Sequence, residues 1–210
     1  MPSVTKRNKF VFTKSFLRRT GCIANLQGAK DDIAKAKSNG DTQLFHYMSD
    51  QAAWDQSWDD IAWIRSITRL PVILKGIITD ENAKEAVAAG VQGIIVSAHG
   101  GRQLDGVKAP IEALPEVVDA VRDSGIEIYM DGGVRSGRDI FKALALGAKA
   151  VFIGRPAAWG LAHNGTDGVI EVIDMMKEEF IDTMSLCGCQ SLGELNRSFV
   201  ECKTQLCCKL

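Results

Sequence analysis

The chain has 210 residues, with 25 Lys and Arg against 26 Asp and Glu, so its formal net charge is −1 and no polyanion-binding surface is indicated. Hydrophobic residues make up 46% of the chain and charged residues 24%, an ordinary globular composition that excludes a disordered or collagen-like chain. No apolar run approaches the roughly 18 residues that a membrane helix needs. We therefore expect a soluble protein with a packed core, whose partners include neither nucleic acid nor membrane.

The first 56 residues are expected to form a basic segment followed by a mobile loop. Residues 1–30 contain several Lys and Arg and no acidic residue, a bias that mitochondrial presequences also show, which is the alternative to a non-targeting segment. Residues 31–53 carry no sustained hydrophobic period and include Ser38-Asn39-Gly40-Asp41, which is typical of a long mobile connection. Regular structure is therefore expected from residue 57 onward.

From residue 57 the sequence predicts one helix and then four strand-helix units. Apolar residues at helical spacing indicate an amphipathic helix over residues 57–68 with an inward apolar stripe, and Ser57 and Asp60 suit its N-terminal cap. The expected strands cover residues 72–74, 93–96, 126–130 and 150–153, and the helices that follow them cover 79–90, 111–124, 138–146 and 157–162. Glycines stand where three of these helices must end, at Gly90, Gly125 and Gly147.

The spacing of these units predicts half of a parallel β/α (TIM) barrel. Successive strands begin about 22, 32 and 24 residues apart, close to one eighth of the roughly 250 residues of such a barrel. Because the strand runs do not alternate polar with apolar residues, both faces of the sheet are expected to be buried. A longer amphipathic helix over residues 169–186 is expected to pack outside the barrel. Four units leave two sheet edges unpaired, so residues 57–210 are expected to be the C-terminal half of an incomplete barrel domain.

The six cysteines do not predict a metal site or a disulfide framework. Most of them lie near the C-terminus, and no secretory signal precedes them. Cys187-Gly188-Cys189 lacks the two-residue spacer of common zinc knuckles and has no second pair at ligand spacing. We therefore expect reduced, peripheral thiols and no bound metal.

The ends of the third and fourth predicted strands are rich in glycine and arginine. Parallel α/β proteins place their sites at the C-terminal ends of strands, and the last strands of a barrel often bind phosphate. Gly132-Gly133 lets backbone N–H groups approach an anion, and an arginine follows at each end. A glycine-containing strand end alone is more often a plain turn, but the two ends together predict a phosphate site. Its candidate residues are Asp131, Gly132, Gly133, Val134, Arg135, Gly154 and Arg155.

His99 and Arg102 lie three residues apart in a glycine-rich loop after the second predicted strand. A neutral imidazole there can accept a proton, and a guanidinium can bind a carboxylate in bidentate fashion. A loop histidine and a solvated arginine are the plainer alternative, but this leaves Lys75, at the end of the adjacent strand, unexplained. A cation there suits a cofactor that gains negative charge on reduction. The sequence thus predicts a general base beside an anion site.

Together these motifs resemble the FMN-dependent L-2-hydroxyacid oxidases, the family of glycolate oxidase, over about residues 57–190. The resemblance is carried by Leu70-Pro71-Val72-Ile73-Leu74-Lys75-Gly76, Ser97-Ala98-His99-Gly100-Gly101-Arg102-Gln103, Asp131-Gly132-Gly133-Val134-Arg135 and Gly154-Arg155-Pro156. The first segment is similar to the family's flavin-contacting lysine strand and the second to its active-site signature, usually Ser-Asn-His-Gly-Ala/Gly-Arg-Gln. The last two are similar to its FMN-phosphate segments.

The resemblance implies a role for each residue. His99 would be the catalytic base and contact the substrate, and Arg102 would bind the substrate carboxylate. Lys75 would stabilise reduced flavin, and Ser97 would contact the isoalloxazine ring. Two features depart from the family pattern. Ala98 replaces an asparagine beside the base, which puts rate or affinity in doubt. The family's first four strands, with the tyrosine, tryptophan and aspartate that complete the site, also have no counterpart here.

The implied activity is that of an (S)-2-hydroxy-acid oxidase, which uses FMN and O2 to convert a small 2-hydroxy acid into a 2-oxo acid and hydrogen peroxide. Intact family members are homo-oligomers, and a truncated chain is expected to be inactive alone. Two alternatives stay open: a catalytically silent half-barrel with an interaction or regulatory role, and a dehydrogenase that uses another electron acceptor. Cys208-Lys209-Leu210 resembles the Ser-Lys-Leu address and implies a peroxisomal protein, with the mitochondrion or cytoplasm as alternatives.

Overall fold

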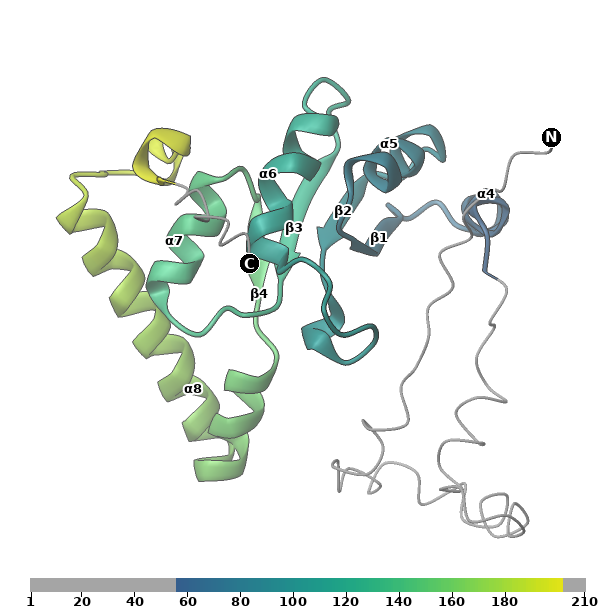
Figure 1. Ribbon diagram of the computed structural model, residues 1–210. Helices are drawn as coiled ribbons and strands as arrows, with labels where there is room; N and C mark the ends of the chain where they lie inside the picture. The colour runs from purple at the N-terminus through teal and green to yellow at the C-terminus, as the bar shows by residue number, and fades with distance from the viewer. Residues whose placement is uncertain (1–55, 202–210) are drawn as a thin grey trace, which may run out of the picture.

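A computed structural model describes residues 56–201 of the chain (Figure 1). The expected basic segment, the mobile connection and the C-terminal tripeptide lie outside the described residues. No helix within the described range combines the length and the apolar character needed to cross a membrane.

Four parallel strands form one sheet in the order β1-β2-β3-β4, as predicted. Their bounds are β1 Ile73–Ile77, β2 Gly93–Val96, β3 Glu127–Asp131 and β4 Ala150–Phe152. The first strand is longer than predicted, so Lys75 lies within it rather than after it. The pairing with β2 shifts between Lys75 and Ile77, where Gly76 takes a φ of 101°. This irregularity changes which side chains of β1 face the helices.

Three helices follow the strands and cover one face of the sheet (Figure 1). These are α5 Asp80–Ala88, α6 Pro110–Ala120 and α7 Gly137–Ala145. Helix α5 contacts β1, α6 contacts β2 and β3, and α7 contacts β4. Gly90, Gly125 and Gly147 take φ values of 75°, 73° and 109° after the three helices, a left-handed geometry that glycine adopts without a Cβ penalty. The predicted ends of α5 and α7 are therefore confirmed to within two residues, whereas α6 ends at Ala120, before its predicted end at residue 124.

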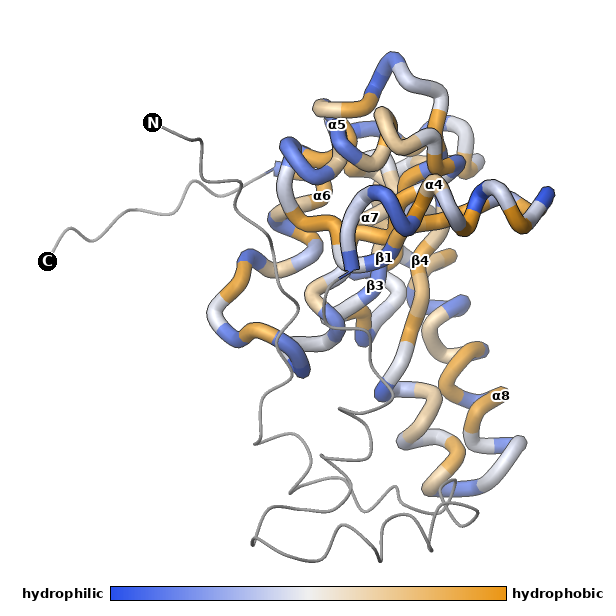
Figure 2. The backbone as a smooth tube through the Cα atoms, turned by 90° about the vertical axis from the view of Figure 1, so that its right-hand side faces the viewer, coloured by the Kyte–Doolittle hydropathy of each residue, from blue (hydrophilic) through white to orange (hydrophobic). Residues whose placement is uncertain are grey.

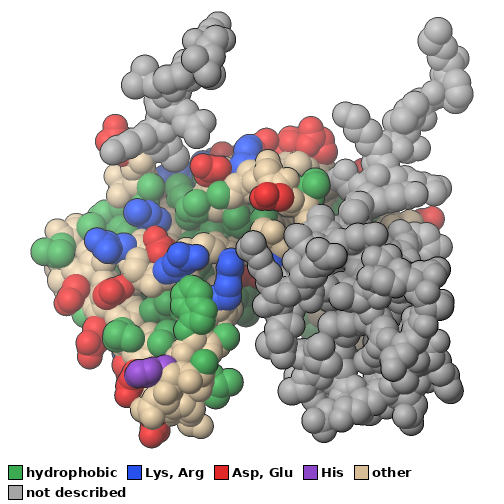
Figure 3. All heavy atoms as spheres, turned by 60° about the horizontal axis from the view of Figure 1, so that its bottom comes forward, with side chains coloured by type: hydrophobic (Ala, Val, Ile, Leu, Met, Phe, Trp, Pro, Cys, Tyr) green, Lys and Arg blue, Asp and Glu red, His purple; other side chains and the backbone are tan. Residues whose placement is uncertain are grey.

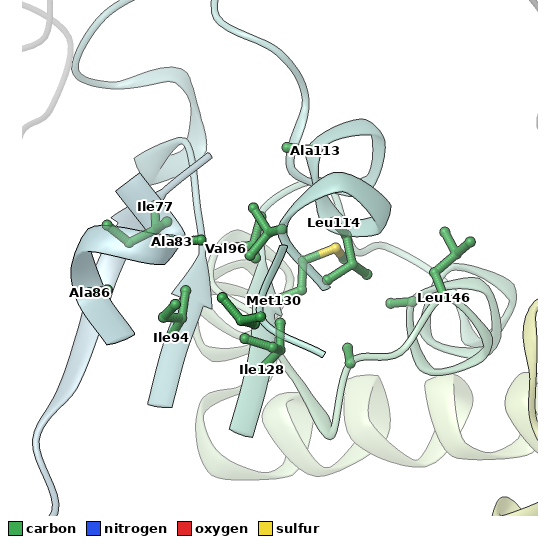
Figure 4. Packing of buried hydrophobic residues seen from close by; sticks show 14 of the residues in the cluster. Ile77, Ala83, Ala86, Ile94, Val96, Ala113, Leu114, Ile128, Met130 and Leu146 are labelled. Atoms are coloured by element: carbon green, nitrogen blue, oxygen red, sulfur yellow. The ribbon is translucent and has the colours of Figure 1, made fainter. Parts of the chain in front are cut away.

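The hydrophobic core lies between these helices and the side of the sheet that we call the covered face. Alternate strand residues supply it, because successive side chains of a strand point to opposite faces. Ile94, Val96 and Met130 are at most 1% exposed, and Leu114 of α6 is fully buried against them (Figure 4). Burial of each such side chain stabilises the fold by about 1.5–3 kcal/mol.

The opposite side of the sheet, which we call the open face, is not covered by a described helix. The pairing register places Ile73 and Lys75 of β1 on the same side as Ile95, Tyr129, Asp131 and Phe152. Ile73 is 44% exposed and Phe152 47% exposed. The prediction that both faces are buried is therefore wrong for the described residues. Uniformly apolar strands did not distinguish the helix-facing side chains from those that face the interior of an incomplete barrel.

The first described helix, α4 Trp58–Ile67, lies beside α5. Ser57 and Asp60 form the predicted capping box, with the Ser57 backbone N–H donating to Asp60 Oδ2 over 2.6 Å. Ile61 is the one buried apolar side chain of α4, whereas Trp63 is 62% exposed. The predicted inward stripe is therefore mostly exposed. Besides the buried Ile61, α4 contacts its neighbour through the Arg65 guanidinium, which donates to the carbonyl oxygen of Ala89.

The last long element, α8 Arg155–Leu186, combines the two helices predicted over 157–162 and 169–186. Asn164 and Gly165 leave helical geometry between them, so two helical segments were correctly expected. Hydrophobic and hydrophilic residues alternate along α8 (Figure 2), and α8 packs on α7 through the rings of Phe141 and Phe180. Two short 3-10 turns, η3 Leu192–Glu194 and η4 Arg197–Phe199, follow it.

Candidate active site

All four strands end at the lower edge of the sheet in Figure 1, which we call the active edge. Parallel strands bring their C-terminal ends together, so loops that are far apart in the sequence become neighbours here. Figure 3 brings this side forward and shows Lys and Arg side chains gathered near the middle of the visible surface. The polar strand ends predicted from the sequence therefore share one region.

Lys75, Ser97 and Asp131 meet across three neighbouring strands. The Lys75 ammonium donates to Ser97 Oγ over 2.9 Å, and its Nζ lies 3.2 Å from Asp131 Oδ2. The Lys75 side chain is 41% exposed and that of Asp131 is 22% exposed, whereas Ser97 is only 2% exposed. The cation and the carboxylate thus sit at the border between core and solvent, with the buried serine beneath them.

The loop after β2 has an unusual backbone. His99, Gly100 and Gly101 form the 3-10 turn η2, with φ values of 52°, 66° and 72°. His99 is the one non-glycine residue of the described range with positive φ, a conformation that costs an ordinary residue about 1–3 kcal/mol. The His99 backbone N–H donates to Ser97 Oγ over 3.1 Å, and the Arg102 N–H donates back to the His99 carbonyl over 3.3 Å. These bonds hold the strained turn.

The surroundings of His99 favour the neutral form of its imidazole. Part of the ring is exposed at the active edge, and the burial of the rest lowers the pKa of His99 below its ordinary value. The positive charges of Lys75 and Arg102 lower this pKa further, while the negative charge of Asp131 opposes them. A neutral imidazole among cations can accept a proton, as a general base must.

Arg155 connects the phosphate-site candidates to the histidine loop. It lies at the start of α8, directly after β4, and its Nη2 donates to the carbonyl oxygen of Gly100 over 3.1 Å. We predicted that Arg155, at the end of the fourth strand, belongs with the phosphate-site residues of the third and fourth strand ends, but its guanidinium bonds to the loop that follows the second strand. The guanidinium therefore lies between the two groups of candidates.

The third strand end combines positive-φ glycines with an ordered arginine. Gly132 and Gly133 have φ values of 88° and 79°, which few other residues tolerate. The Arg135 guanidinium lies 5.7 Å from the centre of the Trp159 ring, a cation-π distance. Asp139 caps the start of α7, and both α7 and α8 begin at the active edge with their positive helix ends. The N–H groups of Arg135, Ser136 and Gly137 already donate to the carboxylates of Asp139 and Glu179. The candidates for binding an anion are therefore the N–H groups of Gly132 and Gly133 and the two arginines.

Sequence reasoning missed Trp159 and did not single out Gln103. Trp159 follows β4 and Arg135 follows β3, so no spacing signal links them. Gln103 lies within the active-site signature, and its Oε1 is buried without a hydrogen-bond partner among the described residues. Asp131 Oδ1 is buried and unpaired in the same way. A ligand that donates hydrogen bonds would satisfy these acceptors.

The predicted peripheral thiols are partly wrong. Cys187 is exposed as expected, but Cys189 is buried, and its Sγ lies 3.2 Å from the carbonyl oxygen of Ser191. The other cysteines lie outside the described residues. Between residues 56 and 201, no three His, Cys, Asp or Glu side chains are close enough together to hold a metal ion.

Comparison with known sequences gives consistent matches. A family model described as FMN-dependent dehydrogenase matches residues 3–202. Human 2-hydroxyacid oxidase 2 is 59% identical over 185 residues, which are 88% of this chain and 50% of that protein. The peroxisomal (S)-2-hydroxyacid oxidase GLO3 of Arabidopsis thaliana is 49% identical over 183 residues, which are 87% of this chain and 50% of that protein.

Comparison with solved structures supports the same grouping. The crystal structure of mandelate oxidase with (S)-2-phenylpropionate superimposes with a TM-score of 0.65 and 51% sequence identity. The match covers 68% of this chain and 42% of that one. These relatives are β/α barrels, so the predicted incomplete barrel is confirmed. The chain spans about half the length of the relatives it matches.

Proposed function

Since the chain belongs to the family of FMN-dependent dehydrogenases, we propose that it carries the base and the cofactor-phosphate site of an (S)-2-hydroxy-acid oxidase. The reaction converts a small 2-hydroxy acid and O2 into a 2-oxo acid and hydrogen peroxide. FMN, when bound, supplies the acceptor for the two electrons. One observation carries the proposal: His99 lies on a strained loop, and burial and the charges of Lys75 and Arg102 lower its pKa, which favours the neutral imidazole.

The residues of the active edge fit FMN. Asp131 Oδ1 is a buried acceptor without a partner, which suits the hydroxyl groups of the cofactor's ribityl chain. Gly132 and Gly133 bring backbone N–H groups close to an anion, and Arg135 and Arg155 add the charge that a phosphate requires. Lys75 and Ser97 would face the flavin ring.

His99 would remove a proton from the substrate, from either its hydroxyl group or its α-carbon. A neutral imidazole accepts this proton, and the nearby Asp131 carboxylate favours the imidazolium that results. Arg102 would hold the substrate carboxylate through its planar fork. The positive charge of Lys75 would stabilise negative charge that develops on the cofactor.

The test joins residues 1–210 to the N-terminal part of human 2-hydroxyacid oxidase 2 that this chain does not match. The chimaera should bind FMN, and its flavin absorbance should bleach when L-lactate or glycolate is added without oxygen. The His99→Ala variant should keep FMN but bleach about 10²- to 10⁴-fold more slowly. Equal bleaching rates in the two proteins would refute the role of His99.

The open face favours a second candidate, the catalytically silent half-barrel. Half-exposed side chains such as Ile73 and Phe152 offer an apolar surface to another chain. Residues 1–210 alone should then retain little FMN and form negligible hydrogen peroxide. A 210-residue monomer with stoichiometric FMN and turnover would exclude this candidate.

The other alternative is a dehydrogenase that uses another electron acceptor. A comparison of oxygen consumption with the reduction of a dye acceptor separates the oxidase from such a dehydrogenase.

We also propose peroxisomal import. Cys208-Lys209-Leu210 resembles the Ser-Lys-Leu address, and one relative is named a peroxisomal oxidase. A fluorescent reporter that carries the last dozen residues should enter peroxisomes, and removal of Leu210 should leave it in the cytosol. A reporter that stays cytosolic with the intact tripeptide would contradict this proposal.

A further inference from the structure

Ser97 is the one polar side chain among the buried residues of the described range. It follows β2 directly and is 2% exposed. Its Oγ accepts one hydrogen bond from the Lys75 ammonium, over 2.9 Å, and another from the His99 backbone N–H, over 3.1 Å. A single buried atom thus connects the cation on β1 with the residue that bears the base.

The bonding capacity of this hydroxyl is nearly filled. A serine oxygen has two acceptor positions and one hydrogen. Lys75 and His99 occupy both acceptor positions, so only the hydrogen is left, and Ser97 can serve a ligand only as a donor. Lys75 has a second partner in Asp131, at 3.2 Å, whereas Ser97 Oγ is the partner of the His99 N–H.

The backbone of His99 depends on this bond. His99 holds a φ of 52° without being glycine, and the flexible Gly100 and Gly101 follow it. Such a conformation persists only when the surroundings determine it. The bond to Ser97 anchors the N-terminal side of the turn, and the Arg155 bond to Gly100 restrains its centre.

We propose that Ser97 is a positioning residue, whose hydroxyl oxygen fixes the Lys75 ammonium and the His99 backbone relative to each other. This deepens the proposed function, because it explains how the base and the cation of that site keep their spacing. Without the hydroxyl, Lys75 is released toward Asp131 or solvent, and the turn loses its anchor. The imidazole is then less affected by the Lys75 charge.

Three charged groups act on the base and decide the direction of the effect, and a fourth is bonded to the neighbouring residue of the loop. Lys75 faces it from β1, Asp131 from β3 and Arg102 from its own loop, while Arg155 of α8 is bonded next to it at Gly100. Lys75 and Arg102 disfavour the imidazolium, and Asp131 favours it. Loss of the Lys75 anchor weakens the first influence, so the pKa of His99 should rise toward its ordinary value.

The experiment measures the His99 titration by NMR in the full 210-residue chain without FMN or substrate. The His99→Gln variant assigns the signal. Ser97→Ala should raise the pKa of His99 and speed hydrogen exchange at its backbone amide. Ser97→Thr, which keeps the hydroxyl, should restore both. Ser124→Ala is the control: it removes the hydroxyl of an exposed serine that donates to the Val121 carbonyl oxygen before β3, and it should change neither.

An unchanged His99 pKa and amide exchange in a folded Ser97→Ala chain would overturn the proposal. So would an equal change in the Ser124→Ala control, since general loosening would then explain the result. If the extra methyl group of threonine prevents folding, the two readouts on the alanine variant still decide. None of these measurements involves flavin, so a failure of the chimaera to bleach would count against the proposed function alone.

Discussion

The two faces of the sheet are built from the same four strands but have different tasks. On the covered face, Ile94, Val96 and Met130 are buried under the helices. On the open face, Lys75 and Asp131 form an ion pair among half-exposed apolar side chains. Because successive residues alternate between the faces, a shift of one position moves a side chain from the stabilising set to the functional set. Stability and chemistry can therefore be altered separately.

Substitutions that shorten side chains on the two faces should differ most in their effect on the free energy of unfolding. Leu114→Ala removes a fully buried side chain over the covered face and should lower the free energy of unfolding by about 2–5 kcal/mol. Ile73→Ala, on the open face, should cost roughly 1 kcal/mol, because Ile73 is 44% exposed. Urea denaturation of both variants measures the difference. Equal losses would mean that another part of the protein covers the open face.

Substitutions at the active edge should change ligand affinity rather than the free energy of unfolding. Arg102→Lys keeps the charge but loses the planar fork, so the chimaera described above should bind a 2-hydroxy acid roughly 10- to 100-fold more weakly. Its affinity for FMN should change much less. Substrate titration of the oxidised flavin and equilibrium dialysis of FMN measure the two affinities. Comparable losses in both would show that Arg102 does not bind the substrate carboxylate.

Local signals were enough to predict the order of elements. The glycines after α5, α6 and α7 and the capping box of α4 depend on residues a few positions apart, and the structure has them as predicted. The exposure of the strands was not predictable in this way. A β-branched run reads the same whether its second face meets helices or the interior of a barrel. The bulge after Lys75 likewise depends on pairing with β2.

The site was predictable as a set of strand ends but not as a set of contacts. Parallel topology was sufficient to bring Lys75, His99 and Asp131 to one edge. The bond from Arg155 to Gly100 joins residues 55 positions apart, and nothing in either segment indicates it. The resemblance implied a contact between Ser97 and the flavin ring, but nothing in the sequence indicated its bonds to Lys75 and to the His99 backbone.

A smaller effect should follow from the Arg155 contact. Arg155→Lys should lose the bond to the Gly100 carbonyl, whose net contribution of about 0.5–1.5 kcal/mol corresponds to roughly 2- to 10-fold faster amide exchange at Gly101 and Arg102. Hydrogen exchange followed by mass spectrometry measures it. Arg197→Lys, at an arginine that bonds Asp119 and the Pro115 carbonyl oxygen instead, is the control and should leave the loop unchanged. Unaltered amide hydrogen exchange at Gly101 and Arg102 in Arg155→Lys would contradict the claim that Arg155 restrains the loop that bears the base.

The smallest expected effect is on the pH dependence of the free energy of unfolding, to which His99 contributes. The pKa of folded His99 lies below the ordinary value of 6.5 because of partial burial and the charges of Lys75 and Arg102. As the pH falls from above 6.5 through the lowered pKa, the unfolded chain takes up the proton first, so the free energy of unfolding decreases. His99 contributes its full share of stability above that window, and solvent screening keeps the share small, since the ring is partly exposed. Urea denaturation across the window should show a shallower decrease for His99→Gln than for the unsubstituted chain. A His99→Gln chain that keeps the full slope would show that the imidazole is not held neutral by its neighbours.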